Sequence, residues 1–184
     1  MSISQICTND YSFPVAKHQN ETEGTMNLYI KQKLFSFGDK YDIYDAEQNP
    51  VYKAFGEVFT IGNKLHLCTT NDEELVFIKQ RVMTFMPAFE LYVRGALFAT
   101  LKKEFTFFYK KINVESAFGS FVIDGNFWDH EYTITCNGKL FGTVSKEWLT
   151  WGDVYALNIN TDKHSEFFVA LVLAIDCILE GEKN

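Results

Sequence analysis

Residues 166 to 180 read Glu-Phe-Phe-Val-Ala-Leu-Val-Leu-Ala-Ile-Asp-Cys-Ile-Leu-Glu, and this stretch decides the fold. Between Phe167 and Leu179 only Asp176 is polar, so a helix here has no polar face for water and must be surrounded by protein or by lipid. A membrane span needs about 20 apolar residues, and this run is shorter and contains a carboxylate. The stretch therefore predicts a buried core helix rather than a transmembrane segment.

Composition indicates one domain with a large core, because 47% of the 184 residues are hydrophobic and 16% are aromatic. The polar, aperiodic segment from Met1 to Thr25 is expected to be a flexible N-terminal arm or an extension, and residues 26–184 a single domain. The arm shows no secretory signal, and no C-x-x-C pair occurs. Reduced thiols and a cytoplasmic location are therefore expected for the four cysteines, Cys7, Cys68, Cys136 and Cys177.

The rest of the chain contains six copies of one unit. Ile30–Ile43, Ile78–Leu91 and Val144–Leu157 align at their apolar positions, and weaker copies begin at Ala54 and Leu101, with one more at Phe121. Three columns of this alignment are apolar or aromatic in every copy. They lie seven residues into each unit (Phe37, Ile61, Phe85, Phe108, Trp128, Trp151), eleven (Tyr41, Leu65, Phe89, Ile112, Tyr132, Tyr155) and thirteen (Ile43, Leu67, Leu91, Val114, Ile134, Leu157).

Each unit predicts two β-strands. The last two columns are two residues apart with one residue between them, which is the period of a half-buried strand. A second strand is expected around each start, for example over Val51–Glu57, Leu75–Gln80 and Leu140–Lys146. Turn sequences such as Arg94-Gly95 and Asn137-Gly138 join the strands, so neighbouring strands should be antiparallel.

The helix and the strands predict one architecture, a mainly β fold. A twelve-stranded antiparallel sheet with one apolar face must bury that face, and a helix that is apolar all round must be enclosed. Both conditions are met if the sheet forms a closed barrel around a central hydrophobic C-terminal α-helix. A β-trefoil also has twelve strands in six hairpins, but has no interior place for the helix. Residues 160–165 should supply hydroxyl and carboxylate caps for the helix, and Gly181 its C-terminal stop.

The patterned region resembles the tubby C-terminal-like superfamily, and within it the LURP-one-related family in its bacterial YxjI-like branch. The resemblance runs from about Leu28 to Leu179 and includes the Ile30–Ile43 and Ile78 repeats, Gly125–Tyr132, Ser145–Asp153 and Ala170–Asp176. It implies a twelve-stranded barrel around a central helix. Several functions accompany that fold: tubby proteins bind phosphoinositide headgroups, phospholipid scramblases share the barrel, and plant relatives are linked to defence.

No catalytic or metal motif is apparent, and no cofactor is expected. The four histidines lack ligand spacing, and Asp129-His130-Glu131 is interpreted as a polar strand start rather than a metal or acid–base cluster. Cys68 and Cys136 have no assigned base and are not expected to be nucleophiles. Asp176 is either a buried carboxylate tied to a strand residue or emerges at an open barrel end, and the barrel end is the expectation.

Positive charge gathers between residues 79 and 111. This segment has seven basic and two acidic residues in a chain of net charge −7, which indicates either an anionic-ligand site or a solvated barrel wall. Adjacent lysines on a strand point to opposite faces and cannot both line one site. The candidates for binding an anionic headgroup are Lys79, Arg81, Lys102, Lys103, Lys110 and Lys111.

The sequence thus predicts a non-enzymatic cytoplasmic binding or scaffold domain of the LURP-one-related type, whose partner is an anionic phospholipid or another protein. Nucleic acid is not expected, because the chain is acidic overall. The alternative is an enzyme with an active site at a barrel mouth. An enzyme should show a concave polar pocket with convergent ionisable groups, whereas a binding module needs only a charged or apolar surface patch.

Overall fold

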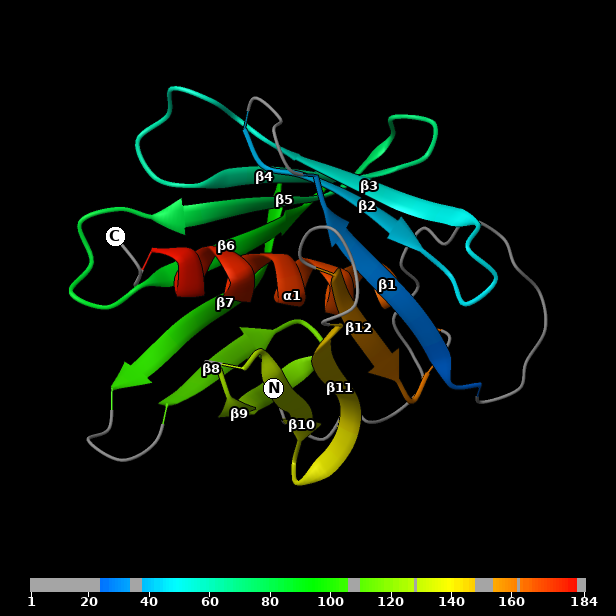
Figure 1. Cartoon of the computed structure of the whole chain (residues 1–184). Helices are drawn as coiled ribbons and strands as arrows, with labels where there is room; N and C mark the ends of the chain where they lie inside the picture. Colours follow the sequence, from blue (N-terminus) through cyan, green and yellow to red (C-terminus); the bar gives the residue numbers. More distant parts are fainter. Residues whose placement is uncertain are drawn as a thin grey trace.

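The computed structural model describes residues 24–33, 38–105, 110–127, 129–147, 154–161 and 163–181 (Figure 1). The predicted arm over Met1–Thr25 lies almost wholly outside the described residues and stays a prediction. Within the described ranges the structure consists of twelve strands and one helix: β1 (Met26–Gln32), β2 (Lys40–Tyr44), β3 (Pro50–Gly56), β4 (Lys64–Thr69), β5 (Glu74–Arg81), β6 (Ala88–Val93), β7 (Ala96–Phe105), β8 (Lys110–Ser116), β9 (Gly119–Asn126), β10 (Glu131–Cys136), β11 (Lys139–Glu147), β12 (Val154–Ile159) and α1 (Ser165–Glu180).

The strands form a closed barrel in which every strand pairs antiparallel with its neighbours in sequence. β1 and β12 close the cylinder, with Met26 opposite Ile159 and Lys31 opposite Val154. Closure leaves no strand with unpaired backbone groups along one side, so the barrel has no edge for another chain to extend. The predicted mainly β, twelve-stranded barrel is confirmed, and the trefoil is excluded.

The sequence repeat becomes two rings of inward side chains. The eleventh and thirteenth positions of the six units lie on β2, β4, β6, β8, β10 and β12, and all twelve are at most 5% exposed. Together they line the barrel where the helix passes. The period-of-two interpretation of these columns is therefore confirmed.

Helix α1 fills the barrel along its axis (Figure 1), and each residue from Phe167 to Leu179 is buried. No helix in the described part of the chain has the length and apolar character needed to cross a bilayer. The predicted side-chain cap is wrong: the N-cap is His164, in a left-handed conformation (φ 61°) with no side-chain capping bond. The Ser165 hydroxyl instead lies 2.8 Å from that of Tyr52 on β3.

The two barrel ends differ. At the end where the helix begins, tight turns join even-numbered to odd-numbered strands, and the central pairs Arg94-Gly95 and Asn137-Gly138 have positive φ angles of 51°, 74°, 50° and 77°. This is the backbone that two-residue hairpin turns require. At the end where the helix finishes, longer connections join odd-numbered to even-numbered strands. We call this second end the loop end.

Candidate functional site

The six predicted headgroup residues do not form one cluster. Lys102 is exposed, whereas its neighbour Lys103 is 5% exposed and points into the barrel, which confirms that adjacent lysines cannot share a site. Lys111 lies on β8, 3.7 Å from the Asp124 carboxylate. The side chain of Lys110 is outside the described residues.

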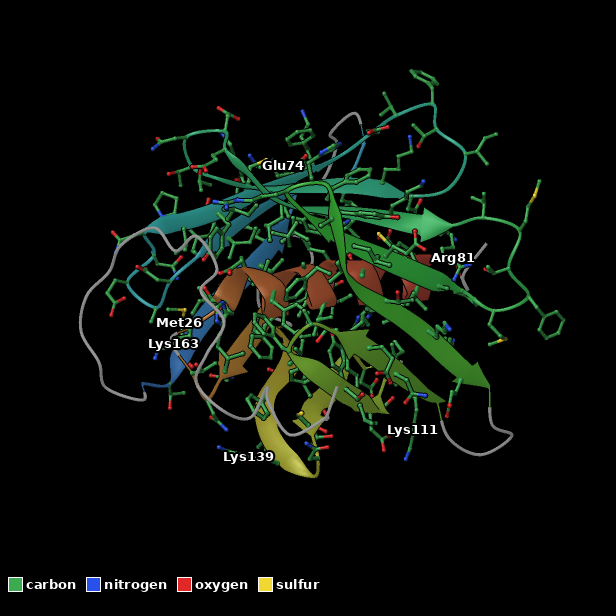
Figure 2. The ribbon with its side chains drawn as sticks, turned by 180° about the vertical axis from the view of Figure 1, so that it is seen from behind. Met26, Glu74, Arg81, Lys111, Lys139 and Lys163 are labelled. Atoms are coloured by element: carbon green, nitrogen blue, oxygen red, sulfur yellow. The ribbon has the colours of Figure 1, made fainter. Side chains whose placement is uncertain are left out.

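Three of the six predicted residues do share a surface, and Lys64 joins them. In the strand register, Lys64 of β4 lies opposite Lys79 of β5. Two residues further along β5, Arg81 lies opposite Ala88 of β6, and Lys102 of β7 lies opposite the same alanine from the other side. All four side chains are on the outward wall of β4, β5 and β7, near the loop end, where Figure 2 labels Arg81. We call Lys64, Lys79, Arg81 and Lys102 the basic wall.

Acidic partners reduce the charge of this surface. Arg81 Nε lies 3.4 Å from the Glu90 carboxylate, and Lys64 Nζ lies 3.0 Å from that of Glu57. Arg94, which contributes to the predicted excess of positive charge, sits in a turn at the opposite barrel end. The charge excess of residues 79–111 is therefore spread over two ends and two faces, and only part of it belongs to the basic wall.

Stacked rings support this part of the wall from the outside. The Phe55 and His66 rings are 5.0 Å apart, His66 and Phe77 are 4.9 Å apart, and Tyr92 follows Phe77 at 6.1 Å, so one ladder crosses β3 to β6. The two ring nitrogens of His66 also contact the Glu57 and Glu74 carboxylates, at 3.1 and 2.5 Å. Such cross-strand pairs hold the outer wall, and with it the basic side chains, in place.

Beside the basic wall, two loops expose large apolar side chains to solvent. The β3–β4 loop presents Phe59 (95% exposed) and Ile61 (86%), and the β5–β6 loop presents Met83 (103%) and Phe85 (101%). Seven of the nine exposed large apolar side chains in the described residues lie on or beside these loops. We call the six loop residues Val58, Phe59, Ile61, Val82, Met83 and Phe85 the apolar rim.

The β3–β4 loop is held against β5 and against the start of the β5–β6 loop. The Asn63 N–H donates to Gln80 Oε1 at 2.9 Å, and the Gln80 N–H donates to the Asn63 carbonyl at 2.8 Å. Gly62 has a φ of 77°, and a Cβ there would lie 2.7 Å from Cγ1 of Val82. A glycine is required at this close approach of one loop to the next.

The apolar rim was not predicted from the sequence. Ile61 and Phe85 belong to the apolar column seven residues into each unit, yet both lie on the surface. The other four members of that column are outside the described residues. The available signal was the absence of charge in the loop sequences, Val58-Phe-Thr-Ile-Gly-Asn63 and Val82-Met-Thr-Phe-Met-Pro87. Ordinary surface connections of this length are polar.

Asp176 does not emerge at the barrel end, so that expectation is wrong. It is 3% exposed and its carboxylate accepts hydrogen bonds from the Tyr155 hydroxyl at 2.7 Å and the Tyr41 hydroxyl at 2.9 Å. Two inward tyrosines of the eleventh column thus supply the donors that a buried carboxylate needs. The tyrosines of that column were the signal in the sequence that a buried carboxylate could be hydrogen-bonded, but the prediction used only their aromatic rings and not their hydroxyls.

The remaining candidates for chemistry are the cysteine thiols and the Asp129–Glu131 segment. Burial raises the pKa of the Cys68 thiol, and burial followed by the nearby Asp176 charge raises that of Cys177, so neither thiol is activated. In the Asp129–Glu131 segment, His130 is buried against the Tyr155 ring while Asp129 is exposed and bonds to Asn126. In the described ranges, no group of three or more His, Cys, Asp or Glu side chains, the His66 cluster with Glu57 and Glu74 included, has an arrangement that could hold a metal ion.

A groove of about 370 Å³ opens on the outer face of β2 and β3. Lys40 and four further charged side chains line it, and those four are matched in pairs: Lys33 Nζ lies 2.8 Å from Asp42, and Lys53 Nζ lies 2.7 Å from Asp72. These charges neutralise one another rather than converge on a common point.

A closed twelve-stranded antiparallel barrel around a hydrophobic C-terminal helix is the fold of the tubby-like class of proteins. The chain belongs to the LURP-one-related family, whose model matches residues 26–176. It is similar to the uncharacterized protein YxjI of Bacillus subtilis, with 30% identity over 159 residues that cover 86% of this chain and 97% of YxjI. It also resembles the X-ray structure of a protein from Arabidopsis thaliana, with a TM-score of 0.64 and 14% identity over 87% of this chain and 92% of that one.

Proposed function

We propose that this protein is a non-enzymatic, cytoplasmic binding module that docks on anionic phospholipid surfaces through the basic wall. The observation that carries the proposal is the arrangement of Lys64, Lys79, Arg81 and Lys102 on neighbouring strands, facing outward beside the uncharged loops of one barrel end. A flat anionic surface can be approached by all four side chains together, whereas a small ligand would need them to converge.

Electrostatics favours a reversible association. Basic side chains near an anionic bilayer each contribute about 1 kcal/mol, and the attraction falls off within roughly 8 to 10 Å near physiological ionic strength. Because the chain as a whole has a net charge of −7, its other faces are repelled by the same surface. The protein should therefore bind in one orientation, with the basic wall toward the headgroups.

Three observations favour a binding module over an enzyme. The groove on β2 and β3 holds matched ion pairs, the thiols of Cys68 and Cys177 have raised pKa values, and Asp176 is enclosed by tyrosines. None of these groups is presented to a substrate in the way that general acid–base or nucleophilic catalysis requires. Cys68, Cys136 and Cys177 are buried free thiols, which supports a reducing compartment.

Vesicle cosedimentation tests the proposal. The protein should sediment with vesicles of phosphatidylserine and phosphatidylcholine at low salt, release in part as salt rises, and bind weakly to phosphatidylcholine alone. Lys79→Glu with Lys102→Glu should abolish most of the low-salt binding.

The matched control is Lys139→Glu with Lys163→Glu, which makes the same change in charge at exposed positions of the opposite barrel end (Figure 2). This control should bind like the parent protein. If the parent protein does not bind anionic vesicles at low salt, or if both double variants lose binding equally, the proposed function is wrong.

A further inference from the structure

We propose that the β3–β4 and β5–β6 loops insert the apolar rim into the hydrocarbon region of the bilayer, so that the protein is anchored and not only electrostatically attracted. This inference rests on the proposed function, because it takes the anionic phospholipid surface as the partner. It adds a second, salt-resistant contribution to binding and assigns that contribution to Phe59, Ile61, Met83 and Phe85.

The loop sequence recurs within the chain. Four connections share one five-residue pattern: two apolar residues, a Ser or Thr, a further apolar residue, and then Gly or Met. They are Leu34-Phe-Ser-Phe-Gly38, Val58-Phe-Thr-Ile-Gly62, Val82-Met-Thr-Phe-Met86 and Trp148-Leu-Thr-Trp-Gly152. The strands that these connections join, β1–β2, β3–β4, β5–β6 and β11–β12, all meet at the loop end. The structure describes the second and third copies in full.

The exposure of these side chains is exceptional for this protein. Phe59, Met83 and Phe85 are at least 95% exposed, while phenylalanines of the interior such as Phe89 and Phe167 are at most 2% exposed. Fold stability gives no reason to keep four large apolar side chains in water on two adjacent loops. A contiguous exposed apolar patch with a polar surround is typical of a binding surface.

The backbone holds the tips outward at some cost. Phe59 and Met83 occupy equivalent positions in the two loops and have positive φ angles of 61° and 62°, a conformation that bulky residues rarely adopt. Hydroxyl groups within the loops bond their own backbone, Thr60 to the Gly62 carbonyl at 2.9 Å and Thr84 to the Arg81 carbonyl at 3.2 Å. Local strain kept in two copies of a loop indicates a function for the projecting side chains.

The side chains of these loops meet one condition for entering a bilayer. Residues 58–63 and 82–87 contain no charged side chain, and each hydroxyl named above already has a backbone partner. Charged groups and unsatisfied polar groups are what oppose insertion into hydrocarbon. The docking of Gly62 against Val82 means that the two tips enter as one preformed unit.

The basic wall identifies a bilayer rather than a second copy of this chain as the occupant. Arg81 directly precedes the β5–β6 loop and Lys64 follows the β3–β4 loop, so headgroup phosphates would meet these cations while the tips lie deeper. Two copies joined through their tips would bring the two basic walls together, which like charges oppose. The projecting shape of the tips suits a fluid layer, because no partner groove has to match it.

Depth-dependent fluorescence quenching tests insertion directly. An environment-sensitive dye is attached at Phe85→Cys in a Cys7→Ser chain, in which Cys68, Cys136 and Cys177 are buried. On vesicles of phosphatidylserine and phosphatidylcholine the dye should shift to the blue, and lipids brominated on their acyl chains should quench it. The matched control is a dye at Leu97→Cys, an exposed apolar position (56%) at the opposite end, which should change little.

A second measurement separates the two contributions to binding. Phe59→Ser with Phe85→Ser should weaken vesicle binding at least about tenfold and remove the part that persists at high salt. Leu97→Ser with Leu140→Ser, which shortens exposed apolar side chains at the other barrel end, should leave both unchanged. All variants should melt like the parent protein, because the altered side chains contribute little to the core.

The outcomes distinguish this inference from the proposed function. Salt-sensitive binding with an unquenched dye and no effect of Phe59→Ser with Phe85→Ser would overturn insertion and leave docking through the basic wall intact. No binding of the parent protein to anionic vesicles would overturn both. Loss of a dimer on changing the tips, without a change in vesicle binding, would assign the apolar rim to self-association and also overturn insertion.

Discussion

At the scale of single residues, the most informative group is the carboxylate of Asp176 with its two tyrosine partners. Removing one donor from a buried charge is costly, because hydrogen bonds to charged groups contribute about 1.5 to 3 kcal/mol each. Asp176 therefore fixes the depth and the rotation of α1 in the barrel, since only one setting of the helix places it between Tyr41 and Tyr155.

The same group predicts loss of stability in alkali. Burial, followed by the Asp176 charge, raises the pKa of Tyr41 and of Tyr132 far above the ordinary 10.0, and that of Cys177 above 9.0. The folded protein keeps these protons, whereas the unfolded chain loses them above about pH 9 to 10. The free energy of unfolding should be flat with respect to these groups below that range and fall above it, by about 1.4 kcal/mol per pH unit for each group.

Urea unfolding followed by circular dichroism from pH 8 to 11 measures this dependence. Tyr41→Phe should be less stable at pH 8, because a hydrogen bond to Asp176 is lost, and should show a shallower decline above pH 10, because one proton fewer is released on unfolding. A decline equal in the parent protein and in Tyr41→Phe would contradict the assignment.

At this scale the sequence predicted residue type better than residue environment. It identified Asp176 as the odd residue of the helix but placed it at the barrel end, because the helix pattern alone does not show which strand positions face it. The tyrosine hydroxyls opposite become visible only when β2, β12 and α1 are packed together. Likewise the strand period predicted that Lys102 and Lys103 point to opposite faces but not that Lys103 is the buried one, and the ion pair between Arg81 and Glu90 depends on strand register.

At the scale of elements, helix α1 forms the centre of the hydrophobic core. Every residue of α1 from Phe167 to Leu179 is enclosed, so this element has no position that tolerates a charge without a built partner. The three strands predicted by range, Val51–Glu57, Leu75–Gln80 and Leu140–Lys146, agree with β3, β5 and β11 to within one residue at each end, because strand period and turn chemistry are local properties. The exposure of Ile61 and Phe85, the two described members of the seventh column, was not predicted, because an apolar residue in a connection has the same sequence signal whether it faces inward or outward.

Leu171→Asp should prevent folding. The Leu171 side chain is 0% exposed at the barrel axis, and an aspartate there would be a buried charge without the donors that serve Asp176. The control is Asn158→Asp, which adds a similar charge at an exposed position of β12. Soluble expression and thermal unfolding distinguish the two, and a cooperatively melting Leu171→Asp protein would count against the helix as the core.

At the scale of the whole molecule, the barrel depends on an element that lies outside its sheet. The six strand pairs can hydrogen-bond to one another, but twelve strands enclose a space that their own side chains do not fill. The overall architecture could be predicted from the sequence for this reason. The repeat predicts the strands of the barrel wall, the apolar stretch predicts the helix inside it, and neither can bury its apolar surface without the other. Of the proposed binding surface, Lys79, Arg81 and Lys102 were predicted from the sequence, whereas the apolar rim was not, because it lies on loops that the core does not constrain.

A chain that ends at Asn160 should therefore be insoluble or should bind hydrophobic dyes, although it keeps all twelve strands. A chain that starts at Thr25 should fold and melt like the full one, because residues 1–24 lie outside the repeat. Adding residues 163–184 as a separate peptide should recover part of the soluble fraction of the shorter chain. Normal folding without the helix, together with loss of folding without residues 1–24, would refute this organisation.

The pairing of β1 with β12 has a consequence for amide hydrogen exchange. In an open sheet the outer strands release their amides to solvent by peeling away, so exchange proceeds inward from the sides. Here both sides of every strand are bonded, and an amide in mid-strand can exchange only when the cylinder itself opens. Slowly exchanging amides should therefore be distributed evenly around the barrel. If a partner slows exchange in residues 57–63 and 82–87, that local change should be easy to detect against this even pattern.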